Sequence, residues 1–230
     1  NISPPDKVTD AEYEGYDHVF VASQRWAGQL SARLRVPVTA LLQCTDPIIF
    51  YPDPDETVPA HEVLFVGNSR RQFRPIVRDA LKAGLPLSVY GTRWEKLIPG
   101  AALRGEHVPN ERLRTYYSRC QVLLNDHWPG MREQGFLSNR LFDAAACGAA
   151  VLSDTVEGLG GVVGEAVATY DDTPAGLKAR VGELLADPGR LAARREEARA
   201  RILAGHTFDH RAQTILEVAR ALDAERAIPW

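Results

Sequence analysis

One segment of the chain carries residue types that suit a phosphate lying next to a sugar hydroxyl. Residues 135–154 run from a glycine through a stretch of small residues to a second glycine and a short apolar stretch. This order predicts a tight turn, a slim helix close to a sheet, a second turn and a buried strand. A turn that leads into a helix start offers free backbone N–H groups and the positive end of a helix dipole, which together suit a phosphate.

Two side chains of that helix suit another part of a nucleotide. Asn139 and Asp143 are four residues apart and therefore share one helix face. Ser138 or Asn139 is expected to cap the helix. An acid one turn inside the helix can accept hydrogen bonds from ribose hydroxyls while the turn holds the diphosphate. The segment therefore indicates a nucleotide-diphosphate site.

These residues need a scaffold, and the apolar pattern predicts alternating strands and helices. Strands are expected at 17–23, 36–42, 62–66, 85–90, 104–108, 122–124, 150–153 and 166–170. Helices are expected at 24–35, 73–83, 111–119 after an Asn110 cap, 139–147, 174–186, 188–204 and from Thr207 or Asp209 onward. Loops are expected at 1–15 and in the Pro-rich run 47–59. The alternation predicts an α/β fold with a Rossmann-like, doubly wound parallel sheet.

Bulk composition excludes several classes of function. The 230 residues are 45% hydrophobic and 25% charged, which is typical of a globular protein. A net charge of −3 gives no basic field, so no nucleic-acid partner is expected. No apolar run approaches the ~20 residues that span a bilayer, so no transmembrane segment is expected. The 3 cysteines without paired spacing predict reduced thiols, a cytoplasmic location and no metal site. The start at Asn1 predicts a fragment.

Two patterns imitate metal sites. Asp53 and Asp55 flank a proline in the Pro-rich run, where a loop is expected. His206 and His210 are four residues apart, but Thr207 between them is an expected helix cap, so the two rings are not expected to share a helical face.

Residues 135–154 resemble the donor-binding signature of GT-B glycosyltransferases in the retaining group 1 class. The pair Asn139-Arg140 ahead of the acid is most similar to the CgeB-like branch of that class. The family signature has two acids separated by seven residues. Asp143 matches the second acid, whereas Gly135 stands at the place of the first, which in the family helps to hold the donor sugar. Glu133 is the alternative for that lost acid.

The resemblance also implies a domain organisation. Residues 1–52 resemble the last β-α-β remnant of an acceptor domain, and 53–59 an interdomain linker. Residues 60–205 resemble a complete nucleotide-sugar donor-binding domain, and 206–230 the C-terminal helix that crosses back. The expected fold is therefore a GT-B donor domain with a remnant of the N-terminal domain.

The remaining candidate site residues follow strand ends or begin helices, where open sheets bind ligands. Gly67 and Asn68 follow one predicted strand, and Gly91 follows another. Arg71 or Arg74 is expected to neutralise a diphosphate, with a solvated basic helix face as the alternative. The resemblance implies that Val108 and Pro109 hold the base with Tyr116, for which a core role is the alternative. One of Asn125, Asp126 and His127 is expected to contact the ligand, with loop capping as the alternative. The resemblance further implies that the backbone of Gly135, Phe136, Leu137 and Ser138 holds the diphosphate, with Asn139, Arg140 and Asp143 beside it.

The resemblance implies the donor half of a glycosyltransferase. It would bind a nucleotide-diphosphate sugar, with a UDP-sugar favoured, and pass the sugar to an unknown glycan, protein or small-molecule acceptor. The reaction is expected to be retaining and to need neither metal nor cofactor, since helix dipoles and cations supply the charge. No catalytic residue is assigned, and the fragment is expected to be inactive alone. The alternatives are a catalytically silent nucleotide-sugar-binding or scaffold domain and a nucleotide-sugar epimerase of GT-B architecture.

Overall fold

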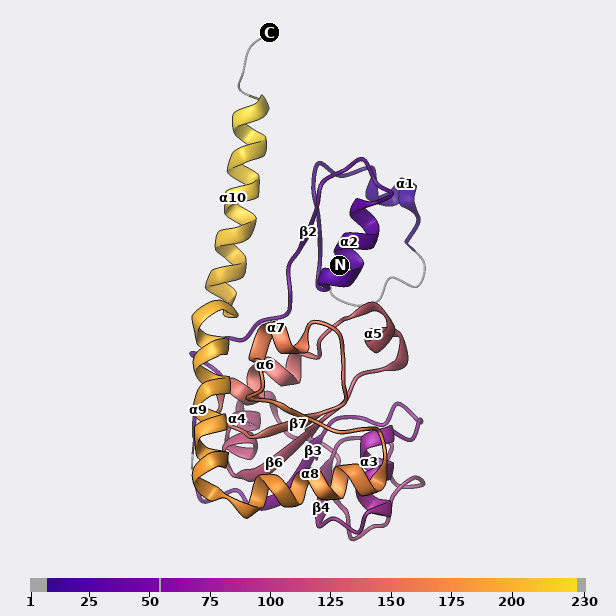
Figure 1. Ribbon diagram of the computed structural model, residues 1–230, viewed down its shortest axis with the longest axis vertical. Helices are drawn as coiled ribbons and strands as arrows, with labels where there is room; N and C mark the ends of the chain where they lie inside the picture. The colour runs from indigo at the N-terminus through magenta and orange to yellow at the C-terminus, as the bar shows by residue number, and fades with distance from the viewer. Residues whose placement is uncertain (1–7, 54, 227–230) are drawn as a thin grey trace.

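The computed structural model describes residues 8–53 and 55–226 and divides them into two units, each built on its own parallel sheet. Figure 1 shows a small unit at the top and a large unit below it, with the last helix extending from the large unit alongside the small one. The candidate residues from position 67 to position 143 all belong to the large unit.

The small unit is one β-α-β unit. Its elements are α1 (Asp10–Tyr13), β1 (Val19–Val21), α2 (Gln24–Ser31) and β2 (Val38–Ala40). Strands β1 and β2 pair in parallel, which confirms the predicted β-α-β unit. Ser23 begins the helix, since its Oγ accepts the Trp26 N–H at 3.0 Å. The loop expected at 1–15 contains the short helix α1, and residues 1–7 of that prediction lie outside the described residues.

The large unit is built on a six-stranded sheet in the order β5-β4-β3-β6-β7-β8, and every described pairing in it is parallel. Its strands are β3 (His61–Val66), β4 (Leu87–Tyr90), β5 (Leu103–Gly105), β6 (Cys120–Asn125), β7 (Val151–Ser153) and β8 (Ala168–Thr169). The strand order reverses direction at β3, which confirms the predicted doubly wound α/β sheet.

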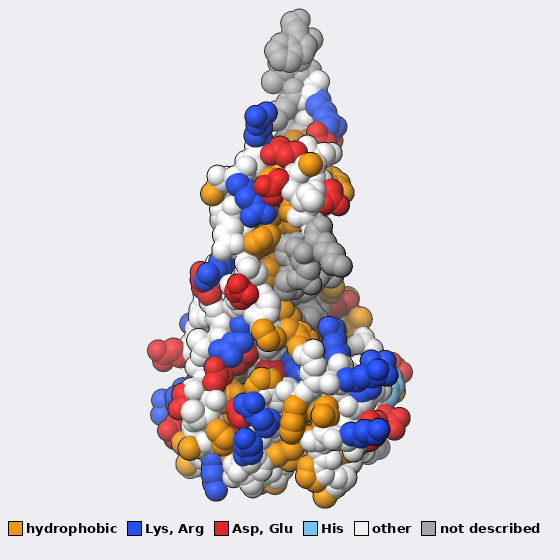
Figure 2. Space-filling view, turned by 90° about the vertical axis from the view of Figure 1, so that its right-hand side faces the viewer, with side chains coloured by type: hydrophobic (Ala, Val, Ile, Leu, Met, Phe, Trp, Pro, Cys, Tyr) orange, Lys and Arg blue, Asp and Glu red, His pale blue; other side chains and the backbone are white. Residues whose placement is uncertain are grey.

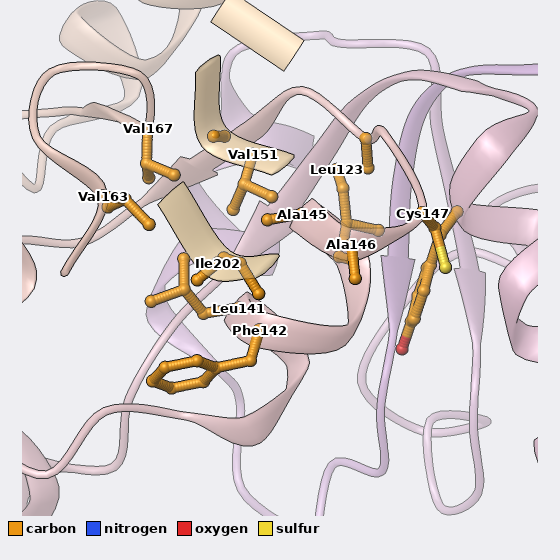
Figure 3. Close-up of a cluster of buried hydrophobic side chains, with 14 of the residues drawn as sticks. Leu123, Leu141, Phe142, Ala145, Ala146, Cys147, Val151, Val163, Val167 and Ile202 are labelled. Atoms are coloured by element: carbon orange, nitrogen blue, oxygen red, sulfur yellow. The ribbon is translucent and has the colours of Figure 1, made fainter. Parts of the chain in front are cut away.

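Helices cover both faces of this sheet. They are α3 (Pro75–Lys82), α4 (Asn110–Ser118), α6 (Asn139–Ala146), α7 (Leu159–Val163), α8 (Pro174–Ala186) and α9 (Pro188–Gly205). The short helix α5 (Pro129–Gln134) contributes no residue to the described core. Alternate residues of each strand face opposite layers: Leu64 and Leu123 pack with α4, α6, α7 and α9, while Phe65 packs with α3 and α8. Figure 3 shows the first of these cores, in which Ala145 of α6 lies against the sheet near Val151. The predicted slim helix therefore does lie close to a strand.

The structure differs from the local predictions in three places. No helix was predicted at α5 or α7, because five or six residues cannot display a helical apolar period. Asn110 is the first residue of α4 and does not cap it; Pro109 precedes the helix without a side-chain cap bond. Ser138 precedes α6, but neither it nor Asn139 caps the helix, because Ser138 donates to Asn125 and Asn139 donates to Asp143.

The C-terminal helix α10 (Phe208–Arg226) joins the two units. Its Arg211 guanidinium donates to the carbonyls of Leu42 at 2.7 Å and Gln43 at 2.9 Å, just after β2. Residues 227–230 of the expected crossing helix lie outside the described residues, and the predicted boundaries at 52, 60 and 205 stay predictions. In the part of the chain that the structure describes, no helix is both long and apolar enough to cross a membrane.

Candidate functional site

A cavity of about 330 Å³ lies at the carboxyl ends of β3, β4 and β5, beside the start of α6. We call it the α6 cavity. It is lined by Val66, Gly67, Asn68, Tyr90, Gly91, Glu106, His107, Val108, Leu113, Tyr117, Asn139, Arg140 and Asp143. Seven of the sixteen predicted site residues meet here, namely Gly67, Asn68, Gly91, Val108, Asn139, Arg140 and Asp143. The sheet topology thus gathers residues that are far apart in the sequence.

Two glycines shape one wall of the α6 cavity. Gly91 has a left-handed φ of +149°, and a Cβ there would overlap the carbonyl oxygen of Gly67. A Cβ on Gly67 would in turn lie 2.5 Å from Arg140 Nη2. Glycine at these two positions therefore lets the ends of β3 and β4 approach each other and leaves room for a guanidinium group.

Arg140 places a positive charge in the α6 cavity. Its Nη1 donates to Asn125 Oδ1 at 3.2 Å, and its guanidinium carbon lies 4.9 Å from the centre of the Phe65 ring. Burial lowers the pKa of Arg140, but an arginine remains charged near neutral pH. Within the described residues no carboxylate forms an ion pair with it. Its charge is therefore available to a bound anion.

Asp143 is the buried acid of the α6 cavity, with only 8% of it exposed, whereas Glu106 is an exposed acid of the same lining. Its Oδ1 accepts from Thr45 Oγ1 at 2.8 Å, and its Oδ2 accepts from Asn139 Nδ2 at 2.6 Å. Burial raises the pKa of Asp143 to about 7, although both hydrogen bonds act in the opposite direction. Each carboxylate oxygen can accept a second donor, so a ribose hydroxyl still has an acceptor here.

The turn ahead of α6 offers fewer backbone donors than the sequence predicts. Gly135 ends α5 in a left-handed conformation, and the Phe136 N–H donates to the Met131 carbonyl at 2.8 Å. The prediction that the Phe136 N–H holds the diphosphate is therefore corrected, because this N–H already has a partner. The N–H groups of Leu137 and Ser138 make no hydrogen bond within the described residues, although neither residue lines the α6 cavity.

Gly135 and Leu137 face the small unit. They line a space of about 40 Å³ between the two units together with Arg25 and Glu157, which form an ion pair at 2.6 Å. Nearby, Ser23 Oγ donates to the carbonyl of Gln134 at 2.5 Å. Glu133, the alternative acid, is exposed on α5 and lines neither this space nor the α6 cavity.

The expected base site is brought together in part. Val108 lines the α6 cavity, whereas the neighbouring Pro109 is exposed and lies outside the lining. Tyr116 packs on Tyr90 with ring centres 4.9 Å apart and does not line the cavity, so its core alternative is the one that the structure supports. Tyr117 takes its place in the lining. The sequence held a signal for this, since Tyr117 is four residues after Leu113, another lining residue.

Arg74 and His127 lie in a second cavity, of about 410 Å³, which we call the α3 cavity. It is lined by Gln72, Phe73, Arg74, Pro75, Asp126, His127, Trp128, Pro129, Arg132, Asp154, Tyr170 and Asp172. Arg74 Nε donates to Asp126 Oδ2 at 2.9 Å inside a buried ion pair. Its charge is thus neutralised, unlike that of Arg140. Arg71 is exposed, has a left-handed φ of +64° and lines neither cavity.

Several neighbours of the predicted residues were missed. Asp154 directly follows β7 and binds His127, so the strand-end rule could have found it. Thr45 could not be found that way, because 98 residues separate it from Asp143. Among the described residues, no group of three or more His, Cys, Asp and Glu side chains is placed to hold a metal ion. His206 and His210 contact Arg211 and Thr207 instead.

The fold and the cavity together define a class. A doubly wound parallel sheet with a ligand cavity at its carboxyl ends, beside a helix start, a buried acid and a free guanidinium, is the arrangement of nucleotide-binding α/β proteins. A family model described as "Glycosyl transferase-like" matches residues 70–217, which is more than half of the chain. The chain belongs to this glycosyl transferase-like family.

Solved structures with the same fold are GT-B glycosyltransferases. Sucrose-phosphate synthase from Thermosynechococcus elongatus is 21% identical with a TM-score of 0.75, over 94% of this chain and 61% of its own. HepE from Anabaena, solved with UDP and glucose, is 15% identical with a TM-score of 0.69, over 96% and 69%. An α,α-trehalose-phosphate synthase (UDP-forming) from Burkholderia vietnamiensis is 12% identical with a TM-score of 0.68, over 96% and 63%. The chain thus spans about 61% of the length of the first.

At these identities the likeness shows the fold. The family and these structural relatives together support a transferase. The comparison with curated proteins gave no match.

Proposed function

We propose that this chain is the donor-binding part of a glycosyltransferase and that its α6 cavity binds a nucleotide-diphosphate sugar. Arg140 and the N–H groups of Leu137 and Ser138 would hold the diphosphate. Asp143 would accept hydrogen bonds from the ribose, and the base would lie beside Val108. Positive charge from Arg140 and the helix start would stabilise the leaving diphosphate without a metal or cofactor.

The single observation that carries this proposal is that Arg140 forms no ion pair with a carboxylate of the described residues. Its guanidinium lies in the lining of the α6 cavity, near the start of a helix, and a neutral amide oxygen is its hydrogen-bond partner. A diphosphate supplies the anion that this arrangement lacks. A UDP-sugar is favoured because one structural relative was solved with UDP and another is named as UDP-forming.

The finer parts of the proposal follow from the family resemblance. We propose a retaining reaction, a place in the CgeB-like branch, and a glycan, protein or small molecule as acceptor. This chain alone would bind the donor and transfer little, since positioning an acceptor is a large share of catalysis.

Titration calorimetry with UDP, GDP, dTDP and ADP tests the proposal. We expect saturable binding of one nucleotide, with Arg140→Ala costing about 1.5–3 kcal/mol of binding free energy, as for a hydrogen bond to a charged group. Arg220→Ala, which removes an exposed arginine on α10, is the matched control and should leave binding unchanged. Absence of binding by all four nucleotides at millimolar concentration would count against a nucleotide site.

One observation favours a catalytically silent binding domain as the second candidate. Gly135 has a φ of +70°, and a Cβ there would lie 3.2 Å from Arg25 Cβ, so the acid of the family signature does not fit this position. The two candidates differ in turnover. A protein that contains this chain together with an acceptor domain should release UDP from a UDP-sugar if it is an enzyme. Tight UDP binding without any release would favour the silent domain.

A further inference from the structure

The α3 cavity has apolar walls that face solvent. Phe73 is 39% exposed although it is a large aromatic residue. Trp128 is half-buried, and the guanidinium of Arg74 lies 4.0 Å from its ring centre. Figure 2 shows the side of the molecule that carries α3 and α5, where Lys and Arg side chains surround a group of hydrophobic ones over the lower half. An open aromatic wall of this kind suits the apolar face of a ring.

The polar floor of the α3 cavity consists of paired groups. Asp126 and Asp154 directly follow β6 and β7, and Asp172 follows β8. Asp126 pairs with Arg74, Asp154 with His127, and Asp172 with Arg132. In the last pair, Arg132 Nη2 lies 2.7 Å from Asp172 Oδ2. Each pair presents both donors and acceptors to the cavity.

One polar atom in this lining lacks a partner. His127 Nδ1 lies 2.6 Å from Asp154 Oδ1, so the carboxylate occupies this nitrogen and Nε2 is the remaining polar atom of the ring. The His127 side chain is fully buried, and its Nε2 has no hydrogen-bond partner among the described residues. A buried polar atom without a partner costs free energy, so a hydroxyl group supplied from outside the chain, which can donate or accept, would be favourable here.

The charges of the lining select among ligands. Two cations, Arg74 and Arg132, face three acids, Asp126, Asp154 and Asp172, and both cations are already paired. An added phosphate or carboxylate would find both cations of the lining already paired, and Arg70, which has no ion pair among the described residues, lies outside the lining, 5.3 Å from the centre of the Trp128 ring. A ligand that is uncharged and rich in hydroxyl groups would match the alternating donors and acceptors.

We infer that the α3 cavity binds an uncharged sugar ring, with its apolar face on Phe73 and its hydroxyl groups on the Asp172–Arg132 pair and at His127. The inference rests on the proposed function, because that function brings sugars to this edge of the sheet. The two cavities flank one aromatic ring: Arg140 lies 4.9 Å and Arg74 lies 5.8 Å from the centre of Phe65. The sugar can therefore come from the nucleotide donor or from the end of an acceptor glycan.

Two variants test this cavity with little risk to the fold. Phe73→Ala removes an exposed side chain outside the described core. Asp172→Asn keeps the shape of a side chain that is 43% exposed, and Asn tolerates its left-handed φ of +59°. Phe208→Ala, at a 60% exposed position on α10, is the matched control. The probes are UDP, UDP-glucose, UDP-N-acetylglucosamine, and methyl glycosides of glucose, galactose and mannose.

If the sugar belongs to the nucleotide donor, one UDP-sugar should bind about tenfold more tightly than UDP. Both variants should then remove this gain while UDP affinity stays constant. If the sugar belongs to an acceptor glycan, a methyl glycoside should bind saturably and UDP should not displace it. Both variants should weaken this binding about tenfold. Binding of no UDP-sugar better than UDP and of no glycoside at millimolar concentration would overturn the inference, as would sugar binding that neither variant changes. The proposed function fails separately, by loss of UDP binding itself.

Discussion

The two cavities at the carboxyl edge of the sheet hold their arginines in opposite ways. In the α6 cavity, Arg140 contacts a neutral amide and an aromatic ring. In the α3 cavity, Arg74 and Arg132 are each paired with a carboxylate. An unpaired guanidinium attracts an anion, whereas a paired one offers only directed hydrogen bonds. One sheet edge therefore provides one place for a charged ligand and another for a neutral one.

The largest effect is expected from removing the carboxylate that pairs with Arg74. Asp126→Ala leaves the guanidinium of Arg74 buried without its carboxylate, so the free energy of unfolding should fall by about 3–5 kcal/mol in urea denaturation. UDP affinity of the folded variant should not fall, because Asp126 does not line the α6 cavity and its loss only removes a negative charge that acts on Arg140. Asp209→Ala, an exposed acid on α10, should change stability by less than about 0.5 kcal/mol. A loss as small as that control would show that the pair is not structural.

Asp143 makes the α6 cavity sensitive to pH. Its pKa is raised from 3.8 to about 7, so the folded chain holds a proton more tightly than the unfolded chain does. That contribution is fully present below the unfolded pKa and is lost as the pH rises through about 7. Asp143→Asn should remove this dependence and raise the free energy of unfolding above neutral pH by on the order of 2–4 kcal/mol.

Denaturation of Asp143→Asn and the unchanged protein at a series of pH values checks this prediction. UDP affinity of the unchanged protein should rise through the same pH range, since the ionised acid is the better acceptor for ribose hydroxyls. Parallel stability profiles for the two proteins would contradict it.

A smaller change tests whether UDP binding depends on the position of the Arg140 guanidinium. Gly67→Ala would place a methyl group 2.5 Å from Arg140 Nη2 and displace the guanidinium. UDP affinity should fall about tenfold, or ~1.4 kcal/mol, while sugar binding in the α3 cavity persists. Gly28→Ala is the control, because nothing lies within 4 Å of an added Cβ there. Equal UDP affinity in both variants would show that Arg140 does not need its present position.

The smallest effect concerns the start of α6. Ser138→Ala removes the hydrogen bond to Asn125 Oδ1, which also holds Arg140, so we expect a loss of about 0.5–1.5 kcal/mol of stability and weaker UDP binding. Thr173→Ala removes a true cap, since Thr173 Oγ1 accepts the Gly176 N–H at 3.0 Å. It should lower stability by about 1 kcal/mol without affecting UDP. Equal UDP affinity in both variants would contradict a link between Ser138 and the α6 cavity.

Local patterns were enough to predict most of the fold. The parallel sheet, the β-α-β unit at the start and the slim helix α6 follow from apolar periods and glycine positions, which act over a few residues. Helices α5 and α7 were missed because they are too short to show such a period. Strand-end glycines and the acid on α6 were predicted correctly as neighbours because parallel strands end at one edge.

The sequence by itself determined which residue types meet at the carboxyl edge of the sheet: glycines, Asn139, Arg140 and Asp143. Only the tertiary structure decided which charges are free. Asp126 neutralises Arg74 across 52 residues, and Thr45 occupies Asp143 across 98. Whether a charge is paired depends on distances of a few ångströms between distant segments, and no local period encodes those distances.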